Sequence, residues 1–340
     1  MRFGFMEDFR NPVKWRRPFP EFYEHILEQI VRGEELGYDN VWLTEHHFTD
    51  DGYNPSLMTT AAAVATRTDT IRIGTFVLLL PYQHPVLIAE EIANVDIFSN
   101  GRFDFGIGQG YSYHEFKAFC MDRSQRGTRM REGIDIIKKL FTEERVTYDG
   151  KFTQLQDARL SPKPIQTPFP PIWIGARGPK AIKNAAKLGY HLMATIGPDP
   201  APLYIDTLKN EGRNPNEFNI AQLRMVYCAE TEDQAWNDCQ DHLFHLLEFY
   251  QDILSEAKDA EGDDAPLPVT KPSDMRNSVL AEHFMVGTPD QIAVKLDNFF
   301  SNYKCTDFIM ATQYPGLDPA KGTRALELFA KEVMPAFQNS

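Results

Sequence analysis

The stretch Asn40-Val41-Trp42-Leu43-Thr44-Glu45-His46-His47-Phe48 decides how this chain is expected to fold. It begins as an apolar run typical of a buried parallel strand and ends in three adjacent titratable residues. Barrel enzymes place their chemistry where strands pass into the following loops, so this stretch has the form of an active-site strand. A single histidine near a strand end is more often structural than functional, so the rest of the chain must decide.

The composition excludes several classes of function. The chain has 340 residues, 42% of them hydrophobic, which suffices for a large core, and its formal net charge is −13. This acidity argues against nucleic acid or an anionic membrane as the main partner. Without a signal-peptide pattern or a run long enough to span a bilayer, we expect a cytoplasmic protein. The four cysteines have no metal-ligand spacing, so we expect free, buried thiols and no metal site.

Strand and helix patterns alternate along the whole chain. After a first strand at the N-terminus, strands are expected at 40–44, 71–80, 102–107, 172–175, 191–195, 219–229 and 307–311. Helices are expected at 21–36, 57–66, 85–98, around 130–141, and at 179–188, 201–212, 233–254, 289–300 and 324–337. This alternation favours an α/β fold consisting of a single (β/α)₈ TIM barrel, about 250 residues plus insertions, that occupies residues 1–340.

Two segments interrupt this rhythm. Residues 146–171 combine a hairpin pattern with five prolines and are expected to form an insertion. Residues 255–276 are rich in Ala, Asp, Glu, Gly and Pro, and we expect a mobile lid loop there.

Two glycine-containing turns are candidates for ligand contact. The run Gly106-Ile107-Gly108-Gln109-Gly110 lacks side chains at three positions, which lets backbone approach a neighbouring group closely. In Gly175-Ala176-Arg177-Gly178-Pro179 a strand passes into a helix that starts with proline. Free amides at the helix start and Arg177 make this second turn suitable for a phosphate, although an ordinary strand-to-helix turn has the same pattern.

A set of short motifs occurs in order over nearly the whole chain. The motifs are Arg2-Phe3-Gly4, Val41 to Phe48, Gly74-Thr75, Leu80-Pro81, His84-Pro85, Gly101-Arg102-Phe103, Phe105-Gly106-Ile107-Gly108, Gly287-Thr288-Pro289 and Val333-Met334-Pro335. In this order they resemble the bacterial-luciferase-like flavin monooxygenases, which are TIM barrels. The resemblance implies an enzyme that uses reduced FMN and O₂ on a small apolar organic substrate. It further implies a separate NAD(P)H:flavin reductase that supplies the FMNH₂, and a homodimer.

The resemblance places the catalytic histidine at His46. Its chemistry needs a group that donates or removes a proton near neutral pH while water is excluded, and histidine suits this. Neighbouring residues on an extended segment point to opposite faces, so His46 and His47 are not expected to act on one atom or to share a metal ion. Glu45 and His47 are expected either to orient His46 or to be structural.

The resemblance also implies the flavin contacts. Arg129 matches a phosphate-contacting arginine, and Phe76-Val77 matches a position where relatives often hold a non-proline cis peptide under the flavin ring. The cofactor-binding residues are therefore expected to be Glu45, Phe76, Val77, Gly108, Gln109, Arg129, Ala176, Arg177 and Gly178. Light-emitting relatives carry Cys-Arg where this chain has Gly108-Gln109, so light emission is not expected.

Several neighbouring residues are harder to assign. Tyr111 and Tyr113 either line the pocket or cover the barrel mouth, and surface or capping roles are expected for His84, His114 and Glu115. Two other functions remain open, an F420-dependent oxidoreductase of the same superfamily and a non-catalytic flavin-binding relative. Relative affinity for reduced FMN and reduced F420, and consumption of O₂, distinguish the three.

Overall fold

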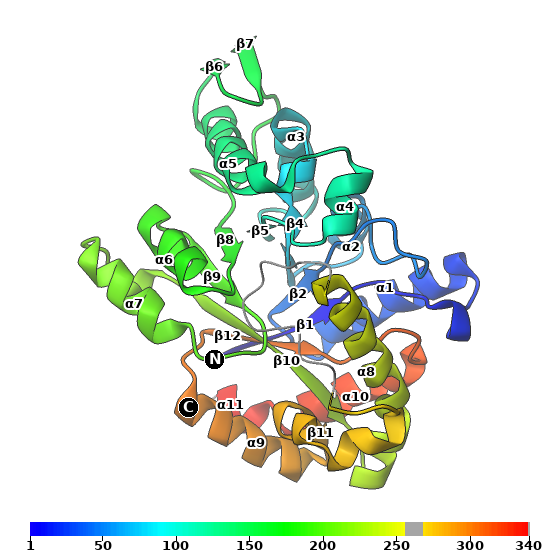
Figure 1. Cartoon of the computed structure of the whole chain (residues 1–340). Coiled ribbons are helices and arrows are strands. Elements are labelled where there is room, and N and C mark those ends of the chain that lie inside the picture. The colour runs from blue at the N-terminus through cyan, green and yellow to red at the C-terminus, as the bar shows by residue number, and fades with distance from the viewer. Residues whose placement is uncertain (256–267, 339–340) are drawn as a thin grey trace.

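A closed ring of parallel strands forms the centre of the molecule (Figure 1). The computed structural model describes residues 1–255 and 268–338. Within them, β1 pairs with both β2 and β12, and β10 pairs with both β9 and β12, which closes a barrel of eight parallel strands. These strands are β1 (Arg2–Glu7), β2 (Asn40–Leu43), β3 (Arg72–Thr75), β5 (Phe103–Gly108), β8 (Ile172–Gly175), β9 (His191–Ala194), β10 (Ile220–Cys228) and β12 (Asp307–Ala311). The predicted TIM barrel is confirmed.

Helices surround the barrel, as Figure 1 shows. They are α1 (Phe19–Glu35), α2 (Leu57–Ala65), α3 (Pro85–Phe98), α5 (Arg126–Thr142), α6 (Pro179–Leu188), α7 (Ala201–Asn210), α8 (Glu232–Ser255), α9 (Pro289–Asn302) and α10 (Pro319–Glu332), with the shorter α4 (Tyr113–Ala118) and α11 (Pro335–Gln338). Apolar residues at helical spacing bury one face of α1, and Gly37 follows it with φ of 83°, a conformation that glycine adopts without a Cβ clash.

The middle of the barrel is filled by two indole rings. Trp42 and Trp173 meet edge to face with their centroids 5.3 Å apart. Glycine on the neighbouring strand makes room, because a Cβ on Gly74 would lie 2.2 Å from the Trp42 ring. The barrel is therefore a packed core below its mouth, as expected for this fold.

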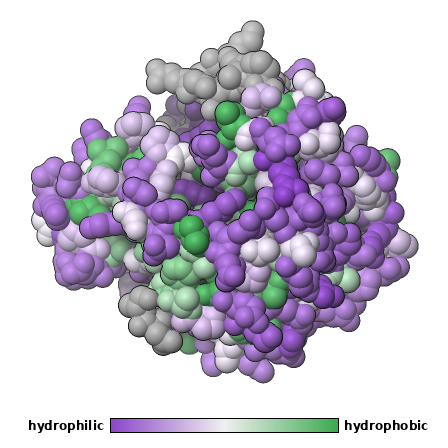
Figure 2. Space-filling view, turned by 90° about the horizontal axis from the view of Figure 1, so that it is seen from below, coloured by the Kyte–Doolittle hydropathy of each residue, from purple (hydrophilic) through white to green (hydrophobic). Residues whose placement is uncertain are grey.

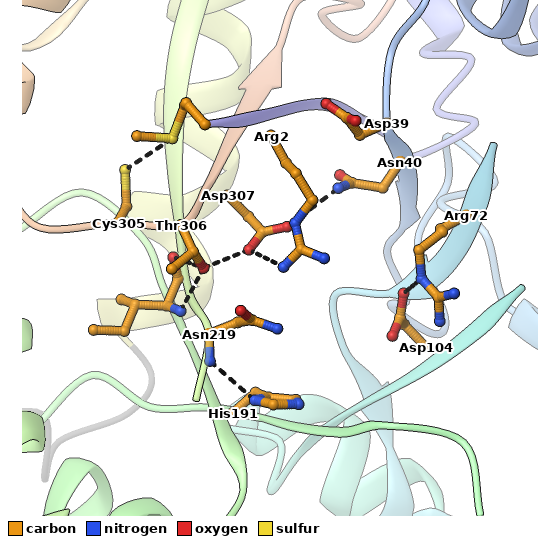
Figure 3. Close-up of polar contacts among 12 residues, drawn as sticks. Arg2, Asp39, Asn40, Arg72, Asp104, His191, Asn219, Cys305, Thr306 and Asp307 are labelled. Carbon is orange, nitrogen blue, oxygen red and sulfur yellow. Dashed lines mark hydrogen bonds and ion pairs between the residues drawn. The ribbon is translucent and has the colours of Figure 1, made fainter. Parts of the chain in front are cut away.

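The lower end of the barrel, where the strands begin, is polar (Figure 3). Arg2 pairs with Asp307 at 2.7 Å and Arg72 pairs with Asp104 at 2.7 Å. His191 accepts a hydrogen bond at Nδ1 from the backbone N–H of Asn219, 3.0 Å away. Charges at this end are paired across strands, an arrangement that contributes to stability rather than to chemistry.

At the upper end of the barrel, where the strands end, the structure differs from the prediction at the third strand. The predicted strand 71–80 is interrupted, because β3 ends at Thr75, the Phe76–Val77 peptide is cis, and the chain resumes as β4 (Leu78–Leu79) and the 3₁₀ helix η2 (Leu80–Tyr82). β4 still pairs with β5, so the segment stays in the barrel wall.

Other departures are smaller. A short strand, β11 (Met285–Gly287), was not predicted and pairs in parallel with the last three residues of β10. The last predicted helix begins earlier, at Pro319 after the capping side chain of Asp318, and breaks before Pro335. All four cysteines are free, but Cys120 is exposed and Cys305 half-buried, so the expectation that all are buried was wrong.

The predicted insertion contains an antiparallel hairpin, β6 (Val146–Asp149) and β7 (Gln154–Ala158), which lies at the top of Figure 1. Most of the predicted lid falls on residues 256–267, outside the described residues. Its end forms the 3₁₀ helix η5 (Pro272–Asn277), which buries Met275. The short 3₁₀ helices η1 (Val13–Trp15), η3 (Arg123–Gln125), η4 (Pro215–Glu217) and η6 (Val279–His283) lie in loops.

Among the helices that the structure describes, none combines the length and apolar character needed to cross a membrane. The face seen in Figure 2 is mostly hydrophilic, with hydrophobic residues in small groups.

The buried histidine at the lower end, His191, leads to a prediction about how stability depends on pH. Burial lowers the pKa of His191 to about 4, against about 6.5 in an unfolded chain. Between these values the unfolded chain binds a proton that the folded chain does not, so stability should fall as pH drops from about 6.5 to about 4. Replacing His191→Asn keeps an acceptor for Asn219 and should flatten this part of the pH profile of unfolding free energy, measured by urea denaturation. The exposed His84→Asn variant is the control, and equal slopes for wild type and His191→Asn would contradict the assignment.

Candidate active site at the barrel mouth

His46 lies at the upper end of β2 and is held from both sides of its ring. It is buried, with 5% of its surface exposed. Its Nδ1 lies 2.7 Å from Oε1 of Glu115, and its Nε2 lies 3.0 Å from the hydroxyl of Tyr111. Both partners come from the segment after β5, so two adjoining parts of the barrel mouth fix one imidazole.

Glu115 is the anchor of this arrangement. It sits in the first turn of α4, where the side chain of Ser112 accepts a hydrogen bond from its backbone N–H. Its Oε1 also accepts from the backbone N–H of His47 at 2.9 Å, and its Oε2 accepts from the Tyr82 hydroxyl at 3.2 Å. Burial raises the pKa of Glu115, but the hydrogen bonds and charges of the two histidines outweigh burial, and the net pKa is lowered. Glu115 is therefore a carboxylate at neutral pH.

This carboxylate determines which nitrogen of neutral His46 carries the proton. A carboxylate can only accept hydrogen bonds, so Nδ1 of His46 donates to Glu115. Nε2 is then the unprotonated nitrogen of the neutral ring and accepts from the Tyr111 hydroxyl. Burial raises the pKa of Tyr111 well above its ordinary value, so that phenol keeps its proton. The nitrogen available for proton transfer is Nε2.

The structure corrects the expectation for Glu115 and supports the structural alternative for Glu45. Glu115 was expected at the surface or in a cap, but only 2% of it is exposed. The pattern Ser112-x-x-Glu115 predicts a helix start and a capping glutamate, and tertiary packing turns the side chain to His46 instead. Glu45 does not orient His46, because its Oε1 pairs with Nε2 of His47 at 2.7 Å and its Oε2 accepts from Leu79 N–H at 2.8 Å. The two histidine rings do face different partners, as strand geometry predicted.

Aromatic rings cover the free faces of His46. The rings of Tyr53 and Phe249 meet it edge to face at centroid distances of 4.8 and 6.0 Å. The Tyr53 hydroxyl is the middle member of a chain of three hydrogen-bonded hydroxyls. Its oxygen lies 2.8 Å from that of Thr44 and 3.0 Å from that of Tyr250. Phe249 and Tyr250 belong to α8, so this helix covers part of the mouth. Tyr111 is part of the site, whereas Tyr113 is exposed.

The predicted flavin-ring contacts lie together at the mouth. Phe76 and Val77 are half-buried. A Cβ on Gly108 would lie 2.3 Å from Val77 Cγ2, and one on Gly175 would lie 2.9 Å from Val77 Cγ1. The glycines of both predicted turns therefore admit the Val77 side chain. Gln109 is half-buried.

The two predicted phosphate candidates differ in their surroundings. Gly178 is the N-cap of α6 without a side-chain cap, and a Cβ there would meet nothing within 4 Å. Ala176 is buried, while Arg177 is exposed and its charge lowers the pKa of Tyr111 against the larger effect of burial.

Arg129, the second candidate, lies in the first turn of α5 and packs against the inserted hairpin. Its guanidinium stacks on Phe152 with Cζ 4.2 Å from the ring centroid. Its Nε is buried and has no hydrogen-bond partner in the described part of the chain. The structure describes no group of three or more His, Cys, Asp or Glu side chains placed to hold a metal ion.

Comparison with known proteins identifies a family for nearly the whole chain. Residues 1–302 match the profile described as luciferase-like monooxygenase. The chain is 27% identical over 337 residues to the oxygenase component of a flavin-dependent trigonelline monooxygenase from Acinetobacter baylyi. This match covers 94% of this chain and 91% of the relative. The crystal structure of monooxygenase RslO1 from Streptomyces bottropensis superposes with a TM-score of 0.85 and 26% identity, covering 99% of this chain and 100% of that one.

A second kind of relative uses another cofactor. An F420-dependent glucose-6-phosphate dehydrogenase from Microbacterium testaceum is 34% identical over 216 residues, 59% of this chain and 64% of the relative.

The site geometry predicts the tautomer of His46. In wild-type protein, two-dimensional ¹H–¹⁵N spectra of the imidazole should show neutral His46 protonated at Nδ1. Replacing Glu115→Ala should remove this preference and lower the unfolding free energy by about 1–3 kcal/mol, because the His46 and His47 N–H groups lose their acceptor. Glu115→Gln keeps an acceptor and should retain the tautomer at a smaller cost. Protonation at Nε2 in the wild type would contradict the assignment.

Proposed function

Because the chain belongs to the luciferase-like monooxygenase family, we propose that it is an FMN-dependent monooxygenase in which His46 handles a proton beside the reduced flavin. One observation carries the proposal. The buried imidazole of His46, after a barrel strand, has Nδ1 hydrogen-bonded to the Glu115 carboxylate and Nε2 hydrogen-bonded to the hydroxyl of half-buried Tyr111. Similarity to the oxygenase component of a flavin-dependent monooxygenase over nearly the full length supports a flavin as the cofactor.

The residues present fit reduced FMN. Half-buried Phe76 and Val77 offer an apolar surface to a flat ring at the barrel mouth. The uncapped start of α6 at Gly178 offers backbone N–H groups and a helix dipole to a phosphate, and Arg177 adds a positive charge beside it. The orphaned Nε of Arg129 is a further donor suited to an anion. When bound, reduced FMN supplies the electrons that activate O₂ for transfer of one oxygen atom to a small organic substrate.

The protein side of the reaction follows from the hydrogen bonds. Glu115 accepts from Nδ1 and holds His46 in one orientation, which leaves Nε2 as the nitrogen that can take a proton. Tyr111, which is half-buried, donates from its hydroxyl to Nε2. Phe249 and Tyr250 of α8 exclude water from this side of the ring. We further propose that a separate flavin reductase supplies FMNH₂, because the relative is named as the oxygenase component of its monooxygenase. We also propose a homodimer, which rests on the family resemblance alone.

An F420-dependent dehydrogenase is the second candidate. It is favoured by the 34% identity to an F420-dependent relative, although that match covers less of the chain. Such an enzyme would bind F420, transfer hydride from its substrate to oxidised F420 or from reduced F420 to its substrate, and consume no O₂. A non-catalytic flavin-binding protein would hold flavin without O₂ consumption above that of free flavin.

The role of His46 can be tested with a flavin reductase, NADH and FMN. Replacing His46→Ala should lower oxygenation of responsive compounds in a panel of small organic molecules by about 10²-fold or more, the usual contribution of a proton-transfer group. FMN affinity should change little, because the proposed ring and phosphate contacts remain. His84→Ala removes an exposed histidine and should leave both quantities unchanged. Equal oxygenation by the two variants would refute the role assigned to His46.

The phosphate site makes a separate prediction. Wild-type protein should bind FMN more tightly than riboflavin, which lacks the phosphate. Replacing Arg177→Ala should reduce that preference by about tenfold to a hundredfold, the value of a charged hydrogen bond. Lys180→Ala serves as the control, because it removes a different exposed positive charge, one that lies in α6. Fluorescence titration of both flavins measures the ratio, and a ratio unaltered in Arg177→Ala would place the phosphate elsewhere.

A further inference from the structure

Arg10 is a buried cation beside the site that the proposed mechanism does not use. It follows β1, and only 1% of its surface is exposed. Its Nε donates to Oδ2 of Asp51 at 2.6 Å. Both terminal nitrogens, Nη1 and Nη2, are buried and have no hydrogen-bond partner among the described residues. Buried donors are rarely left unpaired, because the lost hydration is not recovered, so these two groups call for an acceptor.

The rings around Arg10 do not replace that acceptor. Phe249 lies over the guanidinium with its centroid 3.9 Å from Cζ, and the Tyr53 centroid lies 5.2 Å away. A stacked ring interacts with the flat face of the guanidinium. The N–H groups point outward in its plane, so stacking leaves Nη1 and Nη2 free to donate.

The same two rings contact His46. Tyr53 and Phe249 each lie edge to face against its imidazole. The charge of Arg10 also acts on Tyr111, the hydroxyl partner of His46, whose pKa burial raises and Arg10 lowers. An acceptor bound by Arg10 would therefore lie in the aromatic mouth, close to the nitrogen that handles the proton.

The local charges favour an uncharged acceptor. Asp51 already pairs with Arg10, and the carboxyl of Asp8 accepts from the Arg10 backbone N–H at 3.0 Å. Burial raises the pKa of Asp8 to about 6, so it is largely ionised at neutral pH. One guanidinium thus faces two carboxylates, and a third anion would add repulsion in a buried place. A carbonyl oxygen has two lone pairs and no charge, which suits Nη1 and Nη2.

We propose that Arg10 is a substrate-binding residue that donates from Nη1 and Nη2 to the carbonyl oxygen of an aromatic substrate. The aromatic lining packs on the substrate ring, and the hydrogen bonds place the carbonyl group beside His46. This assignment names a substrate class for the proposed monooxygenase site and rests on that site, but binding can be measured without turnover.

The test compares three probes of similar size by ligand-observed NMR titration of the purified chain, with and without saturating oxidised FMN. Acetophenone has the carbonyl, ethylbenzene lacks an acceptor, and benzoate carries a charge. At pH 7.5 acetophenone should bind about tenfold more tightly than either of the others, the value of a hydrogen bond to a charged donor. Equal binding of acetophenone and ethylbenzene, or tighter binding of benzoate, overturns the proposal.

Variants then locate the donor. Arg10→Met leaves Asp51 unpaired, so the double variant Arg10→Met with Asp51→Asn keeps the local net charge of the wild type and protects folding. It should bind acetophenone and ethylbenzene equally, while Arg67→Met, which removes an exposed arginine paired with Glu24, should keep the wild-type preference. A preference that survives in the double variant contradicts the role of Arg10. Loss of monooxygenase activity alone would leave these binding results unchanged, so the two proposals fail separately.

Discussion

The carboxylate of Glu115 is the contact on which the barrel mouth depends. One oxygen accepts from both His46 Nδ1 and the backbone N–H of His47, and the other accepts from Tyr82. The carboxylate therefore ties the loop after β2 to the segments after β4 and β5 and fixes the tautomer of His46. Burial raises the pKa of Glu115, but the hydrogen bonds and charges of His46 and His47 outweigh burial, so the net pKa is lowered and the group is ionised at neutral pH.

The two ends of the barrel use charge differently. At the lower end Arg2 and Arg72 each pair with an aspartate, and the charges are matched across strands. At the upper end Arg10 pairs through Nε only, and Glu7 is buried with Oε2 unpaired and its pKa raised well above the ordinary value, first by burial and then by Asp8. Paired charges suit the lower end of the barrel, which has a structural role. Buried polar groups without partners are concentrated at the upper end, where a ligand would supply the missing hydrogen bonds.

Local patterns predicted the fold and part of the site. Short-range periodicity and turn chemistry predicted the order of the barrel strands, the helix starting at Pro179 and the different partners of the His46 and His47 rings. The partner of His46 did not, because Glu115 lies 69 residues away and its helix-start pattern predicts a cap. The interruption of strand three at Phe76–Val77 was foreseen only through resemblance, since the residues themselves are apolar and suit a regular strand. The unpaired donors of Arg10 depend on packing from α8, which no sequence pattern expresses.

Family membership is compatible with either FMN or F420 as the cofactor. The position of the bound ring relative to His46 tests the role proposed for this site. A crystal structure of the chain with FMN tests this most directly. We predict the flavin ring on Phe76 and Val77, its phosphate at Ala176 to Gly178, and His46 Nε2 or the Tyr111 hydroxyl within about 3 Å of the reacting edge. A ring bound elsewhere, or bound with its reacting edge turned away from His46 and Tyr111, would contradict this prediction.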